Sequence, residues 1–170
     1  MISPKIKQNI IRLAINEGKL NLKGNKLKGG EKIEKYLVPF KALFIKHNPK
    51  YLNPEQGFEW CCAYVYYIIR QAGYDITIQP FKDSTMHLGS VEAWINWAIQ
   101  ENRLQKSWQD VEAGDLVIFD YLMGEALDHI GIVTEIHDNY LLCSEGNFYN
   151  KSGIFKRVKD DKIWGYIKLN

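Results

Sequence analysis

The 170-residue sequence contains no run of about 18 apolar residues, the length that a membrane-spanning helix needs. It also lacks the apolar core of a secretory signal peptide, because Met1 to Lys7 leads directly into an amphipathic segment. We therefore expect neither membrane insertion nor a signal peptide. The chain is expected to be synthesised in the cytoplasm.

Cysteine is scarce, with Cys61, Cys62 and Cys143 as the only three. Neighbouring cysteines such as Cys61 and Cys62 cannot form an unstrained disulfide, so we expect the chain to be made in a reducing compartment. The sequence has no C-x-x-C, H-x-x-x-H or D-x-D-x-D-G spacing, and its four histidines are scattered. These absences argue against a zinc or calcium site, and we expect no metal and no cofactor.

The net charge of +2 is distributed unevenly along the chain. Residues 1–50 carry 12 Lys and Arg against 3 Glu, a net +9, whereas residues 51–170 carry 10 against 17, a net −7. A nucleic-acid-binding module would combine such a basic region with a reading helix or an aromatic platform, and residues 1–50 show neither. We expect no nucleic-acid partner. The lysines are expected to solvate a helical surface; the alternative is a patch that binds a polyanion.

Four helices are predicted from apolar residues at helical spacing, over residues 3–18, 31–46, 60–72 and 90–100. Ser3 and Pro4 are typical of an N-cap followed by the first helical position, and Gly73 is typical of a helix C-terminus. Pro39 lies inside the second predicted helix and is expected to break it.

The remaining chain is rich in short β-type runs, at residues 116–119, 130–133, 140–143, 154–158 and 164–167. They predict an antiparallel meander. Asp115 and Asp120 bracket the first run and are expected to be turn and edge residues, whereas Cys143 lies in an apolar run and is expected in the core. Helices first and a sheet second indicate an α+β fold, with N-terminal helices packed on a C-terminal antiparallel sheet in one domain over residues 1–170.

Cys61 falls in the first turn of the helix predicted at 60–72, on its core-facing stripe. A thiol attacks only as a thiolate, and the free N–H groups and positive dipole end of a helix N-terminus lower the pKa of a thiol placed there. The same N–H groups can receive an oxyanion. Cys61 is therefore a candidate nucleophile, although a cysteine acting only as a small buried hydrophobic residue fits the same stripe.

His129 opens the strand predicted at 130–133, where a histidine is either a base that works near neutral pH or a half-exposed surface residue. Glu145 and Asn147 end the next strand at positions i and i+2, so they share one face of it, with Gly146 between them. Such a polar pair can hold an imidazole in its productive tautomer. Together with Cys61, these residues form the pattern of a generalised catalytic triad.

The two strands must pair in a particular register for His129 and Glu145 to share a face. A three-residue turn at 137–139 would give that register, with Asn147 opposite His129. A two-residue turn at 138–139 would instead place Glu145 behind the sheet. We predict the first register, or a β-bulge that restores it.

Four motifs resemble, in the same order, those of CHAP domains, the cysteine, histidine-dependent amidohydrolase/peptidases. They are Trp60-Cys61-Cys62-Ala63-Tyr64-Val65 with Gln71-Ala72-Gly73-Tyr74, Ala113-Gly114-Asp115-Leu116-Val117-Ile118-Phe119, Asp128-His129-Ile130-Gly131-Ile132-Val133 and Glu145-Gly146-Asn147. The resemblance covers residues 58–168 and implies a papain-like catalytic core, preceded by a helical, basic part at residues 1–57.

The resemblance also implies roles for individual residues: Cys61 as the nucleophile, His129 as the base, Glu145 as the orienting group and Asn147 as a second polar residue beside it. Cys62 stands where the family has a small residue, but the preceding tryptophan and the core-facing stripe favour Cys61. The acidic calcium loop of some family members is missing, so calcium dependence is not expected.

The substrate that the resemblance implies is bacterial peptidoglycan, cut at the muramoyl-L-alanine amide or within the stem or cross-bridge peptide. Two alternatives stay open: a papain-like amidase acting on a non-wall amide, and a non-catalytic cell-wall-binding module. Without a signal peptide, a wall hydrolase acts after release or secretion. A phage-type endolysin with a holin fits this, as does an antibacterial effector with a secretion machine and an immunity protein. We expect a monomer.

Overall fold

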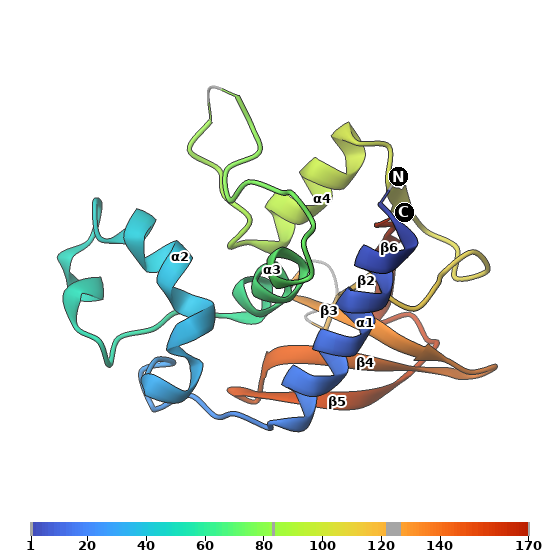
Figure 1. Ribbon diagram of the computed structural model, residues 1–170, viewed down its shortest axis with the longest axis horizontal. Coiled ribbons are helices and arrows are strands. Elements are labelled where there is room, and N and C mark those ends of the chain that lie inside the picture. The colour runs from blue at the N-terminus through green and yellow to red at the C-terminus, as the bar shows by residue number, and fades with distance from the viewer. Residues whose placement is uncertain (1, 83, 122–126, 170) are drawn as a thin grey trace.

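The computed structural model describes residues 2–82, 84–121 and 127–169. Within these ranges the helices precede the strands in the chain (Figure 1). The helices are α1 (Pro4–Lys19), the 3₁₀ helix η1 (Glu31–Ile33), α2 (Glu34–Phe44), the 3₁₀ helix η2 (Pro49–Leu52), α3 (Cys61–Gln71) and α4 (Val91–Gln100). The strands are β1 (Leu104–Gln105), β2 (Leu116–Phe119), β3 (His129–Ile136), β4 (Tyr140–Phe148), β5 (Lys151–Val158) and β6 (Ile163–Ile167).

This order confirms the α+β prediction and agrees with a papain-like fold. The helix ends follow the predicted chemistry. The Ser3 hydroxyl accepts the N–H of Ile6 at the start of α1, and Gly73 follows α3 with a positive φ of 92°, a conformation that glycine adopts without strain. None of the helices in the described part of the chain is long and apolar enough to cross a membrane.

Pro39 does not break the second helix, contrary to the prediction. It lies inside α2, where its missing N–H removes one backbone hydrogen bond. The helix persists because Tyr36, Leu37 and Phe40 are fully buried, and packing of this apolar face outweighs the loss of one bond.

All strand pairs in the sheet are antiparallel, in the spatial order β1-β6-β2-β3-β4-β5. The predicted meander is confirmed from β2 to β5. It is wrong for β6, which returns across the sheet to pair with β2 instead of β5. This return makes β2 a central strand, and its four residues are all buried.

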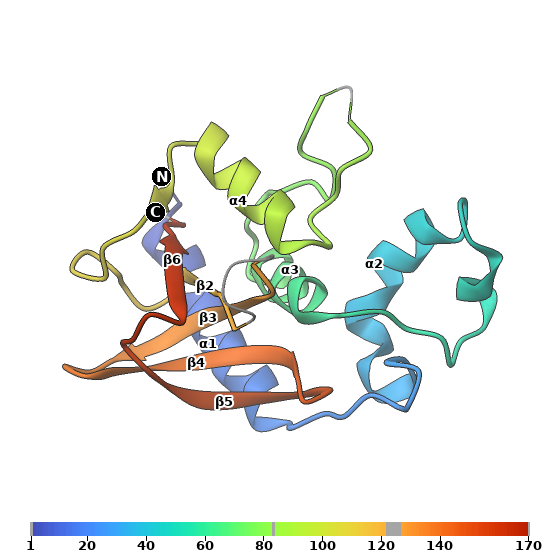
Figure 2. The same ribbon diagram turned by 180° about the vertical axis from the view of Figure 1, so that it is seen from behind.

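Two helices cover one face of this sheet. α1 packs on β3, β4 and β5, and α3 packs on β3 and β4 (Figures 1 and 2). The main hydrophobic core therefore joins Ile10 of α1 to Ile68 of α3 and Ile130 of β3. A smaller cluster lies on the other face of the sheet and includes Phe119 and Cys143, which confirms the prediction that Cys143 is a core residue.

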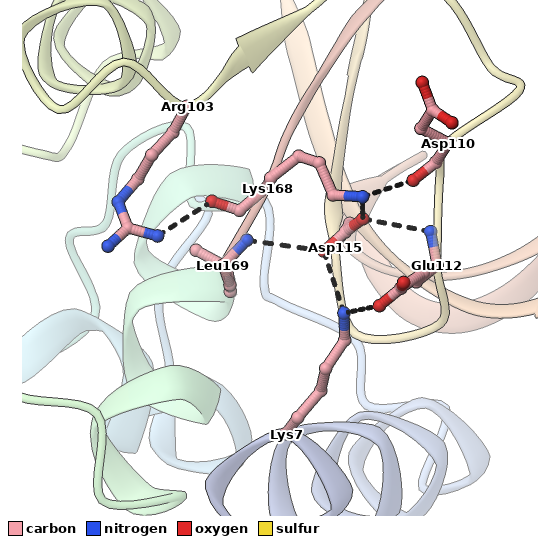
Figure 3. Close-up of polar contacts among 7 residues, drawn as sticks. All are labelled: Lys7, Arg103, Asp110, Glu112, Asp115, Lys168 and Leu169. Atoms are coloured by element: carbon pink, nitrogen blue, oxygen red, sulfur yellow. Dashed lines mark hydrogen bonds and ion pairs between the residues drawn. The ribbon is translucent and has the colours of Figure 1, made fainter. Parts of the chain in front are cut away.

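Asp115 closes a turn, as predicted, since its N–H bonds to the carbonyl of Glu112 (3.1 Å), but its side chain has no exposed surface. It follows Gly114, whose φ of 94° turns the chain inward beneath α1. The Asp115 carboxylate accepts the backbone N–H groups of Glu112 (3.0 Å) and Leu169 (3.3 Å) and lies 3.4 Å from the Lys7 ammonium group (Figure 3). One buried carboxylate thus ties α1 and the C-terminal segment to the start of β2.

Replacing Asp115 with Ala is expected to lower the free energy of unfolding by about 3 kcal/mol, since the change removes the acceptor of two N–H groups and the counter-charge of two partly buried ammonium groups, those of Lys7 and Lys168. Urea denaturation measures the loss. The matched control is Glu112→Ala, because the Glu112 side chain also pairs with Lys7 but is 57% exposed. The control should cost less than about 1 kcal/mol. Equal losses from the two variants would contradict a buried anchoring role for Asp115.

Candidate active site

Cys61 is the first residue of α3, and its side chain is 6% exposed. The N-cap residue, Trp60, provides no side-chain hydrogen bond to the helix. The N–H groups of the first turn and the positive end of the helix dipole therefore act on whatever anion lies at this position. A thiolate at residue 61 would be stabilised by the N–H groups and by the helix dipole.

Aromatic packing fixes the start of α3. The Trp60 ring stacks on Tyr36 of α2, with 5.7 Å between the ring centroids, and its Nε1–H donates to Asn150 (3.2 Å). Gly146 of β4 lies against the other side of the helix. A β-carbon there would lie 2.4 Å from Cβ of Tyr64 and 2.8 Å from the Trp60 ring, so only glycine allows this approach.

The imidazole of His129 interacts with the Cys61 thiol from the first residue of β3. A hydrogen bond from Cys62 and the interaction with His129 lower the pKa of Cys61 well below its usual value, against the opposing effect of burial. Burial also opposes protonation of His129, but hydrogen bonds with Cys61 and Glu145 raise its pKa to about 10. These shifts favour a thiolate–imidazolium pair at neutral pH.

Glu145 holds the other side of the imidazole. His129 Nε2 lies 2.8 Å from Glu145 Oε2, and the Glu145 side chain has no exposed surface. Because Nε2 is engaged by the carboxylate, Nδ1 is the nitrogen left to exchange a proton with the thiol. The structure thus brings Cys61, His129 and Glu145 together in the order of a triad.

The β3–β4 hairpin has the predicted register, reached through the β-bulge. Its turn is the two-residue one, since the N–H of His137 bonds to the carbonyl of Tyr140 across residues 138–139. A register shift between Val133 and Glu135 then restores the pairing, so that Gly131 lies opposite Glu145. His129 and Glu145 consequently share a face of the sheet.

Glycines lie opposite Glu145 on both neighbouring strands, Gly131 on β3 and Gly153 on β5. A β-carbon at Gly131 would lie 2.7 Å from Cγ of Glu145, so the missing side chain provides the space through which Glu145 reaches His129. On the other side, the Phe155 ring folds over Gly153, where a β-carbon would lie 2.5 Å from it. The sequence motif contains Gly131, but its role was not predicted.

Asn147 does not join this group. Its backbone has a positive φ of 62°, and its side-chain amide donates to the carboxylate of Glu59 (2.5 Å). Glu59 in turn pairs with Lys28 from the N-terminal part of the chain. The expected placement of Asn147 beside His129 and Glu145 therefore differs from the structure, because the left-handed backbone directs the side chain toward the surface before α3.

Arg157 of β5 was not predicted from the sequence. Its Nε and Nη2 donate to the two carboxylate oxygens of Glu145 at 2.7 and 2.6 Å. A buried carboxylate needs a cationic partner, and this requirement was the only indication in the sequence that a neighbouring strand would supply one. The register of β5, in which Arg157 pairs with Leu141, places it on the Glu145 face.

Cys62 lies behind the nucleophile candidate, with 4.0 Å between the two sulfur atoms. It is 1% exposed, and burial followed by the hydrogen bond with Cys61 raises its pKa. Cys62 therefore keeps its proton when Cys61 has lost its own. A neutral thiol beside the thiolate can donate to it, which stabilises the anion.

Metal coordination has no support in the described ranges, since no cluster of three or more His, Cys, Asp or Glu side chains there could hold an ion. Comparison with protein families finds a match to the model described as the CHAP domain, over residues 53–147. No curated protein matches the chain. The matched range contains Cys61, His129 and Glu145 but ends before β5 and excludes α1.

Iodoacetamide at about pH 6 is expected to modify Cys61 and to spare Cys62 and Cys143, since only thiolates react and the other two thiols have raised pKa values and are buried. Fragment ions from peptide mass spectrometry distinguish Cys61 from Cys62. In a His129→Gln variant the modification should slow by about tenfold or more, because the thiolate loses its cationic partner. Preferential modification of Cys62 would contradict this geometry.

Proposed function

Because the chain belongs to the CHAP domain family, whose members are amidohydrolases and peptidases with peptidoglycan as substrate, we propose that it cleaves an amide bond of bacterial peptidoglycan. We assign the reaction to Cys61, His129 and Glu145. The observation that carries the assignment is the contact of a helix N-terminal thiol with an imidazole that a buried carboxylate orients.

The proposed reaction has two steps. The Cys61 thiolate attacks the amide carbonyl carbon, and the carbonyl oxygen becomes an oxyanion. Imidazolium His129 then donates a proton to the leaving amine as the C–N bond breaks, which leaves an acyl-thioester on Cys61. Neutral His129 removes a proton from water, the resulting hydroxide attacks the thioester, and the acid product leaves as Cys61 returns to the thiolate.

The start of α3 supports the oxyanion in this proposal. Trp60 provides no side-chain cap, so the first-turn N–H groups remain available to a developing negative charge. A preorganised donor of this kind contributes about 3 to 4 kcal/mol of transition-state stabilisation in well-studied enzymes. The same groups stabilise the resting thiolate.

Glu145 acts on His129 alone in the proposed mechanism. Its hydrogen bond to Nε2 keeps the ring oriented with Nδ1 toward the thiol, and its charge stabilises the imidazolium. The bond we propose is the muramoyl-L-alanine amide or a peptide bond of the stem or cross-bridge. Both present the carbonyl and the leaving amine that the two steps require.

Purified peptidoglycan is expected to release soluble muropeptides with the wild-type protein and none with Cys61→Ala, a loss of about 10⁴-fold or more. Mass spectrometry of the fragments identifies the bond. Cys62→Ser is the matched control, since the hydroxyl keeps a hydrogen-bond donor in a buried position of similar size. It should retain most of the turnover. Absence of fragments from the wild-type protein on walls of several types would favour a different amide substrate or a binding module.

The pH dependence of turnover follows from the two opposed shifts. The proposed active form has a thiolate and an imidazolium, so kcat/KM should rise as pH passes the lowered pKa of Cys61 and fall as pH approaches about 10, the pKa of His129. Rates measured between about pH 5 and 11, with circular dichroism as the folding control, test this. A decline centred near the ordinary histidine value of about 6.5 would contradict the charged pair.

A further inference from the structure

We propose that Arg157 is a positioning residue of this site, which pairs with the Glu145 carboxylate, directs it at His129 and thereby keeps the Cys61–His129 pair charged at neutral pH. Arg157 lies on β5, beyond the matched range of residues 53–147. This inference rests on the proposed function. Its test measures the thiol itself and needs no wall substrate.

The contact between Arg157 and Glu145 is bidentate. Arg157 occupies both carboxylate oxygens, while Oε2 also meets His129 Nε2. A fork of two donors fixes the rotation of a carboxylate as well as its charge. The orientation of Glu145 toward His129 therefore depends on β5 as much as on β4.

Burial makes this cation necessary. Glu145 has no exposed surface, and the Arg157 side chain is 14% exposed. A buried carboxylate without a cationic partner is strongly disfavoured. Three aromatic rings, those of Phe119, Tyr121 and Phe148, contact both His129 and Arg157. Their centroids lie 5.8 to 6.0 Å from the His129 ring centroid and 4.1 to 5.5 Å from the Arg157 guanidinium carbon.

Besides His129 and Arg157, other titratable groups in the described structure interact electrostatically with Glu145. They are Tyr121 beyond β2, Tyr64 on α3 and Cys143 on its own strand, and the pKa of each is raised, chiefly by burial. Cys62, beside Cys61, also keeps its proton. In the proposed resting state, charge alternates along one line in this part of the described structure: Cys61 negative, His129 positive, Glu145 negative and Arg157 positive.

This alternating line sums to zero, and Arg157 is the member that cannot lose its charge. Without Arg157, two anions would flank one imidazolium in a buried site, at a net charge of −1. The excess is relieved when Cys61 takes up a proton, because Cys61, at 6% exposed, is the more accessible of the two anions, and Glu145 has no exposed surface. We therefore expect the loss of Arg157 to act at Cys61, two contacts away.

The experiment measures the iodoacetamide alkylation rate of Cys61 against pH for the wild-type protein, Arg157→Met and Arg157→Lys. The midpoint of the rate curve should rise by about one pH unit or more in Arg157→Met. It should stay near the wild-type midpoint in Arg157→Lys, because lysine keeps the positive charge although it loses the bidentate guanidinium contact. The control is Lys156→Met, which removes a charge from the adjacent position of β5, where the ammonium group lies over the Tyr140 ring instead of near Glu145.

A double variant, Glu145→Gln with Arg157→Met, removes both charges of the buried pair and should return the midpoint toward the wild-type value. An unchanged midpoint in Arg157→Met would overturn the proposal, as would an equal shift in Lys156→Met or in the double variant. If Arg157→Met does not fold, Arg157→Gln supplies a neutral donor for the same comparison. A shifted midpoint without any wall hydrolysis would refute the peptidoglycan assignment and leave the role of Arg157 standing.

Discussion

The carboxylate of Glu145 has no contact with solvent, and it is the group that most of the site must accommodate. A buried negative charge needs partners on both oxygens, which come from His129 on one neighbouring strand and Arg157 on the other. It also needs space, and both residues opposite it in the sheet are glycines. The bulge in β3 serves the same end, because without its extra residue Glu145 would point to the other face. Register, glycine placement and strand order are thus all constrained by one side chain.

The family match begins at residue 53, but the fold also depends on residues before it. Ile10 and Ala14 of α1 belong to the main core, and the carbonyl of Ala14 accepts the hydroxyl of Ser144, the residue before Glu145. Asp115 adds a buried ionic contact between α1 and the sheet. The N-terminal helix therefore supports the strand that carries the orienting carboxylate. Part of the basic charge of residues 1–50 is used internally in this way, since Lys7 faces a buried aspartate.

Much of the arrangement was predictable because it depends on local chemistry. Ser3, Pro4 and Gly73 have fixed backbone preferences at helix ends. Side chains alternate between the two faces of a strand, so the two-residue hairpin turn required a bulge to place His129 and Glu145 on the same face. Three features were not predictable in this way. Asn147 turned outward because its left-handed backbone angle falls at the register shift of β4 between Glu145 and Phe148. Asp115 became buried through contacts with both ends of the chain, and Arg157 met Glu145 only through the pairing of β4 with β5. Each depends on residues distant in sequence, which periodicity and capping rules do not describe.

The close packing of α3 against Gly146 divides the proposed machinery between two layers. The nucleophile belongs to the helix, whereas the base, its carboxylate and the arginine belong to three adjacent strands of one sheet. The sheet residues stay together as long as the strands remain hydrogen-bonded. The proposed Cys61–His129 pair, by contrast, depends on the packing of α3 against β3 and β4. In the proposed mechanism, opening of this packing would lower the reactivity of Cys61 while the strands of the sheet stay paired.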